Sequence, residues 1–299
     1  MRKIKIITDS CSDLSGELLD RYGIDYAKMS TVQNGVESEA DLRWTNEDAH
    51  ILYEYMRVGG RVTTAQVGTE EFQRIFKEYI NDGYDIIYIG CSLKQSGSVN
   101  TGHMVASKIL ENNPDARIAC IDSMNASLGE GMLAIEGAKL VDKGCTFDQI
   151  VDSLLATRKK INQYVTVHSL TTLKKAGRVK GPAAFFGNLM GVKPILISDA
   201  NGDQAAYKKV KGRQGSFDEI VAMLKSSIID AENQTVYVAH ADCSKDEIDI
   251  LVNKIKEEIS PRDIYVGYIG PIIGASIGPD AVGIWGFGKE ITFKIGDTK

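Results

Sequence analysis

The chain has 299 residues, of which 43% are hydrophobic and 25% are charged, and its formal net charge is −5. That length supports a large core and two domains, and the composition is typical of a globular protein. The negative charge and a sequence pI near 5.5 argue against a nucleic-acid partner. The densest basic segment, residues 208–213, is too short to change that conclusion.

Signals for export or membrane insertion are also missing from the sequence. The chain contains no apolar run of about 18 residues, and its first residues lead into a predicted strand rather than a signal peptide. We therefore expect a cytoplasmic protein that does not insert into a membrane.

The five cysteines, at positions 11, 91, 120, 145 and 243, show no Cys-x-x-Cys spacing, and the four histidines are scattered. An odd number of cysteines without such a pair does not suggest a disulfide framework. Neither residue type has metal-ligand spacing, so the sequence predicts no metal site. Cys11 and Cys91 follow predicted strands, where a reactive thiol is conceivable, but we interpret both as small buried side chains.

The first half of the chain alternates short apolar strands with helices. Strands are predicted at residues 3–8, 24–29, 86–89 and 118–121, and helices at 15–22, 45–55, 69–80 and 98–110, with more helix up to about 160. Thr45 and Asp48 have the form of a capping box, and residues 33–44 are predicted to form a loop or hairpin. Residues 63–68 are predicted to form a turn, with Thr69 capping the next helix. This alternation implies βαβ units and a mostly parallel sheet.

After residue 161 the pattern changes. Strands are predicted at 164–169, 192–197, 204–210, 235–239, 264–269 and 281–287, and helices at 170–176, 182–190, 217–229 and 244–259, with a glycine-rich turn at 270–280. Strand pairs without long crossovers indicate a mixed α/β domain. We therefore predict an α/β protein with domains at residues 1–160 and 161–299 and a ligand site in the cleft between them.

The strongest site signal lies in Ile86–Thr101. A strand that reads as buried on both faces ends at Gly90, and a helix begins near Ser96 and Gly97. Unpaired N–H groups at a helix start attract anions, and Ser92, Ser96 and the serine at 98 would add hydroxyl donors. A single capping serine with the others in solvent is the alternative. Because four strand ends carry Ser, Thr or Asp, we expect a binding site where they converge.

Motifs for cofactors and catalysis are weak or missing. Residues 129–134 match the dinucleotide pattern G-x-G-x-x-A, but they do not follow a strand directly, and no acidic strand end lies about twenty residues on. The sequence contains no Walker P-loop, G-x-S-x-G elbow or protein-kinase motif set. A nucleophile at Ser96 would need a general base, and the sequence cannot place His168 or His240 beside it. No cofactor is predicted.

Seven short motifs, taken in order, resemble those of the DegV family along nearly the whole chain. They are Thr8-Asp9-Ser10 with Asp13-Leu14, Thr64 with Gln66 before Phe72, Ser92 with Ser96-Gly97, Asp122-Ser123, Leu173 through Gly177-Arg178, Val192 to Leu196, and Gly278-Pro279 with Gly283. The resemblance implies two α/β domains, the first related in fold to a domain of dihydroxyacetone kinase. It also implies a long-chain fatty acid in a buried tunnel, which some members present to a partner kinase that makes acyl phosphate.

The resemblance also implies roles for individual residues. The family pattern places the ligand carboxylate against Thr64 and Ser96. The predicted ligand-binding residues are Thr64, Ser92, Ser96, Gly97, Arg178 and Ser276. The predicted tunnel wall includes some of Phe185, Phe186, Leu189 and Met190.

The chain departs from the family pattern near both parts of that site. Residues 65, 67 and 68 are Ala, Val and Gly, where the family has serine, proline and serine, and Ser98-Val99 replaces Thr-Tyr. Ser276 stands in place of a histidine, and Asp280 in place of the second glycine of Gly-Pro-Gly. Serine keeps one donor but is shorter than histidine and cannot carry a positive charge. We therefore expect a bound acid held by fewer direct bonds, and little acyl-phosphate formation.

Three functions compete at this stage. The leading hypothesis is a fatty-acid-binding protein that is not an enzyme. One alternative is an enzyme that acts on a small acyl or phosphoryl substrate at the same hydroxyl cluster, and another is a regulatory or interaction domain with an empty cleft. The sequence shows no proton-transfer pair, which favours binding.

Overall fold

The computed structural model of the chain describes residues 2–168, 170–181, 185 and 191–295. Its helices are α1 Gly16–Tyr22, α2 Asn46–Arg57, α3 Thr69–Asn81, α4 Ser98–Leu110, α5 Leu128–Asp142, α6 Phe147–Thr157, α7 Leu170–Ala176, α8 Arg213–Ser227, α9 Lys245–Glu258 and α10 Pro271–Ile277. Its strands are β1 Lys3–Asp9, β2 Asp25–Ala27, β3 Met29–Gln33, β4 Val36–Ala40, β5 Val62–Ala65, β6 Tyr84–Gly90, β7 Ile118–Asp122, β8 Ile161–Thr166, β9 Val179–Lys180, β10 Val192–Ser198, β11 Gln204–Lys211, β12 Thr235–His240, β13 Asp263–Tyr268 and β14 Val282–Phe287. None of the helices in these ranges combines the length and apolar character needed to cross a bilayer.

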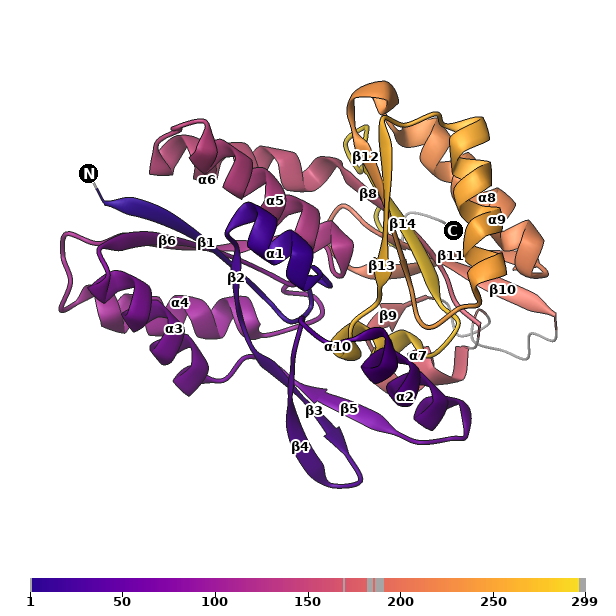
Figure 1. Ribbon diagram of the computed structural model, residues 1–299, viewed down its shortest axis with the longest axis horizontal. Helices are drawn as coiled ribbons and strands as arrows, with labels where there is room; N and C mark the ends of the chain where they lie inside the picture. Colours follow the sequence, from indigo (N-terminus) through magenta and orange to yellow (C-terminus); the bar gives the residue numbers. More distant parts are fainter. Residues whose placement is uncertain (1, 169, 182–184, 186–190, 296–299) are drawn as a thin grey trace.

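The first half of the chain forms a parallel sheet with helices on both faces (Figure 1). Its strand order is β2-β1-β6-β7, and every neighbouring pair is parallel. Along β6, Ile86 and Tyr88 join the core formed with α3 and α4, while Ile87 and Ile89 join the core formed with α5. Because both faces are covered, residues 86–89 of the strand are all apolar or aromatic, which explains the continuous run in the sequence. The expected parallel sheet is confirmed.

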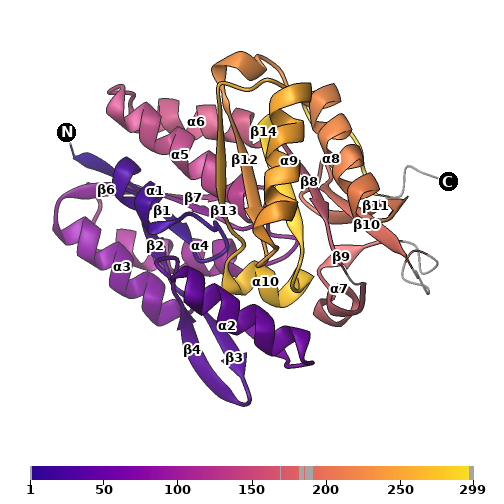
Figure 2. The same ribbon diagram turned by 45° about the vertical axis from the view of Figure 1, so that its right-hand side comes forward.

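The second half forms a mixed sheet with the strand order β13-β12-β14-β8-β10-β11-β9. The pairs β12–β13 and β9–β11 are parallel, and the other neighbouring pairs are antiparallel. Figures 1 and 2 show α8 and α9 together on one face of this sheet. On that face Ile284 packs with Phe217 and Leu251, whereas Trp285 points to the opposite face and the core of α5. The expected mixed α/β half is confirmed.

A small antiparallel sheet, β4-β3-β5, extends from the first half. Asn34 and Gly35 form its two-residue turn, with φ values of 51° and 79°, as a tight hairpin requires. The hairpin expected in residues 33–44 is therefore present. The turn predicted at residues 63–68 is wrong in its first part, because Val62–Ala65 is β5 and pairs with β3. Thr69 is the first residue of α3 and Gly68 is its N-cap, so the predicted capping role of Thr69 is also wrong.

Helix α5 lies between the two large sheets. It contacts β1 and β6 on one side and β8 and β12 on the other. The G-x-G-x-x-A match falls at its start, where a Cβ on Gly131 would lie 2.6 Å from Leu14 Cδ2 and 2.8 Å from the Ser12 carbonyl oxygen. Close packing against a neighbouring loop therefore explains this glycine. One hydrophobic core runs through both halves, and the division at residue 160 stays a prediction.

The segment predicted to be a glycine-rich turn, residues 270–280, contains helix α10, so that prediction is wrong. Pro271 is its first residue, where a fixed φ favours the start of a helix. Contacts with α2, α7, β3 and β5 compensate for the low helix propensity of Gly274. Figures 1 and 2 show α10 beside α2, where the two halves meet.

Candidate functional site

The C-terminal ends of β6 and β7 carry buried hydroxyl groups that bond to the protein itself. Ser92 is fully buried, and its Oγ donates to the carbonyl oxygen of Gly202 at 2.7 Å, in the turn between β10 and β11. Ser123 Oγ donates to the carbonyl oxygen of Asn125 at 3.0 Å. The hydroxyl of Ser92 therefore joins the two halves of the chain. Because it already donates its proton to Gly202, it has no proton left to donate to a ligand.

Ser96 and Gly97 lie at the start of α4, where Gly97 is the N-cap. Ser96 Oγ accepts a hydrogen bond from the Ser98 N–H at 3.2 Å and lies 2.9 Å from Ser98 Oγ. Ser98 is buried, whereas Ser96 is partly exposed. A Cβ on Gly97 would lie 2.2 Å from Gln66 Oε1, so a larger residue here would require this exposed amide to move. Ser96 therefore keeps some access to solvent at this helix start.

A groove of about 310 Å³ lies where β5, α7 and α10 meet, and we call it the cationic groove. It is lined by Met56, Gly59, Gly60, Arg61, Val62, Thr63, Thr64, Thr172, Lys175, Ala176, Arg178, Ala275 and Ser276. Arg61, Lys175 and Arg178 bring positive charge, and Thr64 and Ser276 bring hydroxyl groups. None of these lining residues carries a carboxylate. The groove therefore suits an anion.

A smaller space of about 50 Å³, which we call the apolar pocket, adjoins the groove. It is lined by Gln95, Ala126, Ser127, Gln163, Val165, Arg178, Val179, Leu196, Gln204, Ile269, Ile273, Ser276, Ile277 and Trp285. Arg178 and Ser276 line both spaces, so groove and pocket meet at these two residues. Because Gln95 comes from the first half and Trp285 from the second, the pocket lies between the halves.

Three of the polar side chains around the apolar pocket bond to one another. Gln163 Nε2 donates to Gln204 Oε1 at 2.5 Å, and Trp285 Nε1 donates to Gln163 Oε1 at 3.3 Å. Gln95 differs, because its Nε2 is buried without a hydrogen-bond partner. A buried donor without a partner costs about 1–3 kcal/mol. A ligand that places an acceptor beside this N–H would remove that cost. Gln95 is not among the residues predicted from the sequence, where its position between Ser92 and Ser96 is the signal that could have pointed to it.

Helix α10 is anchored at its start by Asp13. The Gly270 N–H donates to Asp13 Oδ1 at 2.9 Å, and Ser127 Oγ donates to Asp13 Oδ2 at 2.5 Å. Burial raises the pKa of Asp13 to about 7, although these two hydrogen bonds act in the opposite direction. Tyr53 adds a bond from its hydroxyl to the carbonyl oxygen of Ile269 at 2.5 Å. These contacts fix the helix that carries Ser276.

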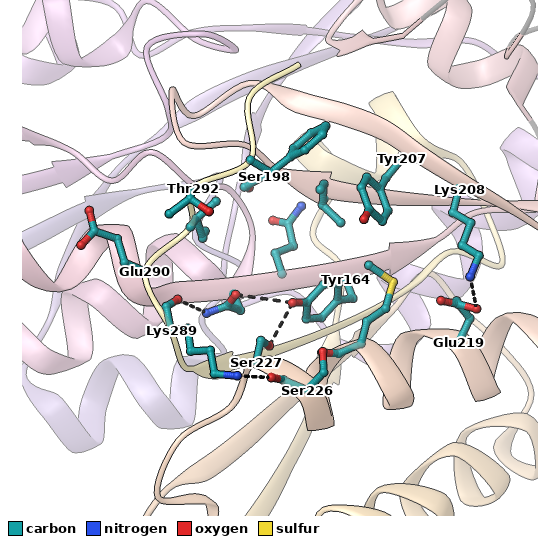
Figure 3. Close-up of a pocket in the computed structure, with 16 residues that line it drawn as sticks. Tyr164, Ser198, Tyr207, Lys208, Glu219, Ser226, Ser227, Lys289, Glu290 and Thr292 are labelled. Atoms are coloured by element: carbon teal, nitrogen blue, oxygen red, sulfur yellow. Dashed lines mark hydrogen bonds and ion pairs between the residues drawn. The ribbon is translucent and has the colours of Figure 1, made fainter. Parts of the chain in front are cut away.

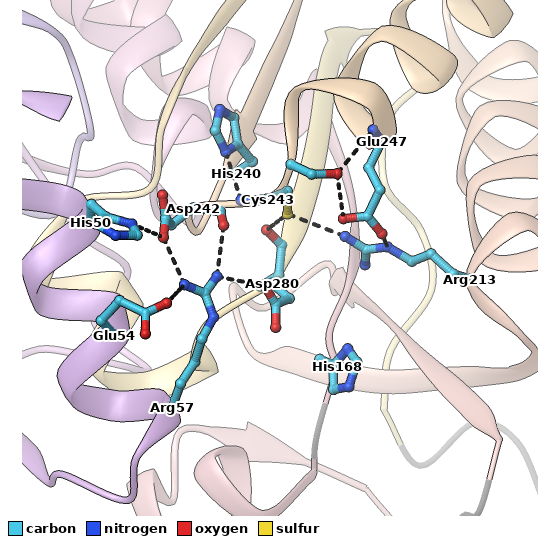
Figure 4. Close-up of polar contacts among 12 residues, drawn as sticks. His50, Glu54, Arg57, His168, Arg213, His240, Asp242, Cys243, Glu247 and Asp280 are labelled. Carbon is cyan, nitrogen blue, oxygen red and sulfur yellow. Dashed lines mark hydrogen bonds and ion pairs between the residues drawn. The ribbon is translucent and has the colours of Figure 1, made fainter. Parts of the chain in front are cut away.

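Arg57 links α2 to the segments around α10 (Figure 4). Its guanidinium donates to Asp242 Oδ2 and to Asp280 Oδ1, each at 2.7 Å, and to Glu54 Oε1 at 2.8 Å. Asp280 has a φ of 61°, which suits a position where the family pattern has glycine and which Asp tolerates better than most residues. The carboxylate at this position therefore adds an ion pair between the halves.

The structure divides the six predicted ligand-binding residues into two groups. Thr64, Arg178 and Ser276 line the cationic groove. Ser92, Ser96 and Gly97 lie in the loop and helix start next to Gln95, and within the described part of the chain they line neither space. The ligand-binding roles of all six stay predictions.

The predicted tunnel wall can be followed at only one residue. Phe185 is buried in the core that runs through both halves, and Lys209 Nζ lies 5.0 Å from the centre of its ring. Phe186, Leu189 and Met190 lie outside the described residues. Their part in a tunnel stays a prediction.

A larger cavity, of about 690 Å³, lies elsewhere, between α8, β11 and the segment after β14 (Figure 3). Several of its polar side chains are paired with other groups of the protein. Tyr164 donates from its hydroxyl to Ser227 Oγ at 2.9 Å, and Lys289 Nζ donates to the Ser226 carbonyl oxygen at 2.9 Å. Because it contains none of the predicted residues, we place the candidate site at the cationic groove and apolar pocket.

Comparison with known proteins gives consistent results. The family model described as "Uncharacterised protein, DegV family" matches residues 3–288. A DegV domain-containing protein of Clostridium perfringens is 32% identical over 301 aligned residues, which cover 100% of this chain and 99% of that protein. The solved structure of a DegV family protein from Thermus thermophilus, described with fatty acid binding, has a TM-score of 0.86 at 24% identity and covers 97% of this chain and 100% of that one. DegV of Bacillus subtilis, described as a fatty acid binding protein, has a TM-score of 0.83 at 24% identity, with 96% and 100% covered.

Proposed function

Because the chain belongs to the DegV family, we propose that it binds a long-chain fatty acid where its two halves meet. The observation that carries the proposal is the junction of the cationic groove and the apolar pocket at Arg178 and Ser276. A carboxylate attached to an acyl chain needs such a junction, with charge on one side and apolar side chains on the other. The fatty-acid-binding descriptions of the Thermus thermophilus and Bacillus subtilis proteins support the same class of ligand.

The head group is placed at the junction. Arg178 can donate two parallel hydrogen bonds to a carboxylate, while the hydroxyls of Thr64 and Ser276 donate one each. Gln95 adds its unpaired N–H from the pocket side. Ser96 can supply a further hydroxyl donor once its hydrogen bond with Ser98 Oγ is broken. Each hydrogen bond to a charged group contributes about 1.5–3 kcal/mol.

The acyl chain is placed in the apolar pocket, which must widen to hold it. A space of about 50 Å³ compares with roughly 30 Å³ for one water molecule in the liquid, so a long chain does not fit without movement. The side chains of Val179, Ile273 and Ile277 line the pocket and would move apart. Burial of each methylene contributes about 0.8 kcal/mol, which can offset the cost of this movement.

We propose binding without catalysis. A reaction at the groove hydroxyls would need a general base, and no residue that lines the groove carries an imidazole, a thiol or a carboxylate in the described part of the chain. The alternative, an enzyme that acts on a small acyl or phosphoryl substrate, lacks that support. Presentation of the carboxylate to a partner kinase is part of the proposal.

The test begins with the full chain purified from a bacterial host. Native mass spectrometry and solvent extraction should show a co-purified long-chain acid. In displacement of a fluorescent fatty acid, Thr64→Ala and Arg178→Gln should each weaken binding about tenfold. Lys174→Gln is the matched control, because Lys174 is an exposed cation on α7 that does not line the groove. An empty protein, or unchanged affinity in both variants, would contradict the proposal, and turnover of an ester or phosphate would favour the enzyme.

A further inference from the structure

Two cysteines and a glutamate that are distant in the sequence meet at the C-terminal edge of the parallel sheet. Cys11 follows β1 and Cys91 follows β6, and these strands are neighbours in the parallel sheet. Glu130 lies in the first turn of α5, which packs on the same sheet. The two Sγ atoms and one carboxylate oxygen all lie within 4.8 Å of one another. Their side chains are almost completely buried, with 2%, 1% and 0% of each residue exposed.

The glutamate presents an unused ligand atom. Thr8 Oγ1 donates to Glu130 Oε1 at 2.8 Å, which orients the carboxyl group. The other oxygen, Oε2, is buried and has no hydrogen-bond partner. The Cys11 sulfur also lies 3.4 Å from Met29 Sδ. The three residues thus offer two thiols and a free carboxylate oxygen in sulfur-rich surroundings.

Charge gives a second argument. Asp9, next to this cluster, accepts hydrogen bonds from the Tyr88 hydroxyl at 2.6 Å and from the Cys11 N–H at 2.9 Å. Asp9 and Glu130 are both 0% exposed, and their carboxyl groups share a hydrogen bond. Within the described ranges the recorded ion pairs include no cationic side chain beside either. Burial of carboxylates without a cation is costly. A divalent cation held at this place would offset that cost.

We propose that Cys11, Cys91 and Glu130 form a binding site for a thiophilic divalent cation, with Zn²⁺ as the ion that fits best. Tetrahedral zinc has Zn–S distances near 2.3 Å and Zn–O distances of about 2.0–2.2 Å, which places its ligand atoms roughly 3.6–3.8 Å apart. The observed cluster needs to contract by about 1 Å at most to reach that geometry. Two thiolates select zinc over Mg²⁺ and Ca²⁺, which prefer oxygen ligands. A water molecule or Asp9 supplies the fourth ligand.

The ion would act as a structural clamp. It would tie the ends of β1 and β6 to the start of α5. Cys91 directly precedes Ser92 and the loop that carries Gln95, and Cys11 lies two residues before Asp13, which anchors α10. The clamp would therefore support both sides of the apolar pocket. No sequence motif predicts this site, because its ligands come from three separate elements.

The first experiment uses the unmodified full chain. Protein expressed with zinc and purified under reducing conditions should contain about one zinc ion per chain, as measured by inductively coupled plasma mass spectrometry. After unfolding and refolding with Co²⁺, it should show a thiolate-to-cobalt charge-transfer band and the visible bands of a tetrahedral site. The proposal would be overturned if the reduced protein contained no zinc and also showed no charge-transfer band after refolding with Co²⁺. A Cys11–Cys91 disulfide in such zinc-free protein, when the reductant is omitted, would point to thiol oxidation instead.

Matched variants assign the ligands. Cys91→Ser and Glu130→Gln should each lower the zinc content at least tenfold and remove the charge-transfer band or shift it. Cys120→Ser is the control, because Cys120 is a buried thiol on the adjacent strand β7, opposite Tyr88, and lies outside the cluster. Glu130→Gln keeps an acceptor for Thr8, so it tests the site without removing that bond. Folding of each variant is checked by circular dichroism, and full zinc content in folded Cys91→Ser or folded Glu130→Gln would contradict the assignment.

Discussion

Ser276 lies where the cationic groove meets the apolar pocket, and its short side chain limits what it can reach. A histidine there would add a ring N–H and, when protonated, a positive charge beside the carboxylate. We therefore expect Ser276→His to tighten fatty-acid binding about tenfold and to raise acyl-phosphate formation with a partner kinase from a low level. Displacement titrations and a phosphorylation assay measure the two effects.

Ser276→Asn is the matched control, because asparagine donates a hydrogen bond but carries no charge. It should tighten binding less than histidine does, and the difference should grow as the pH falls below about 6.5. Robust phosphorylation of the acid bound to the unmodified protein would show that the serine is not limiting.

His240 makes stability depend on pH. Burial lowers its pKa from 6.5 to about 4, with the neighbouring Asp242 acting in the opposite direction. Its Nδ1 accepts from the Cys243 N–H at 3.2 Å, and its ring lies 4.5 Å from that of Tyr268. Below pH 6.5 the unfolded chain binds a proton that the folded protein does not bind. The contribution of His240 is therefore complete above pH 6.5 and is lost as the pH falls towards 4.

The expected loss is roughly 2 kcal/mol of unfolding free energy between about pH 7 and pH 4.5. Urea unfolding at both values gives the measurement. His240→Gln keeps an acceptor for Cys243 without a titrating ring, so it should lose less stability over the same interval. Equal losses in both proteins would mean that other groups cause the pH dependence.

At the scale of single elements, α10 depends on its anchor. Asp13→Ala leaves the Gly270 N–H and the Ser127 hydroxyl without their acceptor, both in the interior. Each unpaired group costs about 1–3 kcal/mol, so we expect a loss of about 2–5 kcal/mol of unfolding free energy and weaker fatty-acid binding. Asp20→Ala, at an exposed carboxylate paired with Arg43, should change little. A small effect of Asp13→Ala in urea unfolding would show that α10 is held by other contacts.

The sequence predicted well the elements that have strong internal patterns. β6 contains an unbroken apolar and aromatic run at residues 86–89, and Thr45 with Asp48 forms the expected capping box of α2. The errors fall where distant contacts decide the structure. β5 depends on pairing with β3, and α10 forms although Gly274 disfavours a helix. Neither contact leaves a periodic signal in its own segment.

The candidate site shows the same limit. Thr64, Arg178 and Ser276 came from the resemblance, because no local pattern places β5, α7 and α10 around one groove. Gln95 could not be singled out, since its importance lies in an N–H that is buried without a partner. Burial and hydrogen-bond pairing of this kind follow from the packing of both halves.

At the scale of the whole molecule, Arg57 tests how firmly the halves are joined. Its side chain is 25% exposed, and the carboxylates of Asp242 and Asp280 are 14% and 30% exposed. Arg57→Ala leaves both carboxylates without this partner, and we expect a loss of roughly 2 kcal/mol of unfolding free energy. Combined with Asp280→Asn in a double-mutant cycle, it should show a coupling of about 1 kcal/mol. Chemical unfolding of the single and double variants measures it.

Arg74→Ala is the control for that cycle, because Arg74 forms exposed ion pairs with Glu71 and Glu78 on α3. It should have little effect on stability and no coupling to Asp280→Asn. Purely additive effects of the Arg57 and Asp280 changes would mean that the ion pair does not hold the halves together.

The place of β14 in the larger sheet has a consequence for synthesis of the chain on the ribosome. β14 is the last strand of the described residues, yet it lies between β12 and β8. Until residue 287 has left the exit tunnel, β8 and β12 each present an edge with unpaired backbone groups. Trp285, which fills the core against α5, is also missing until then. Between the synthesis of β12 and that of β14 the nascent chain therefore carries two open strand edges and an incomplete core, which makes it a substrate for chaperones that bind such surfaces.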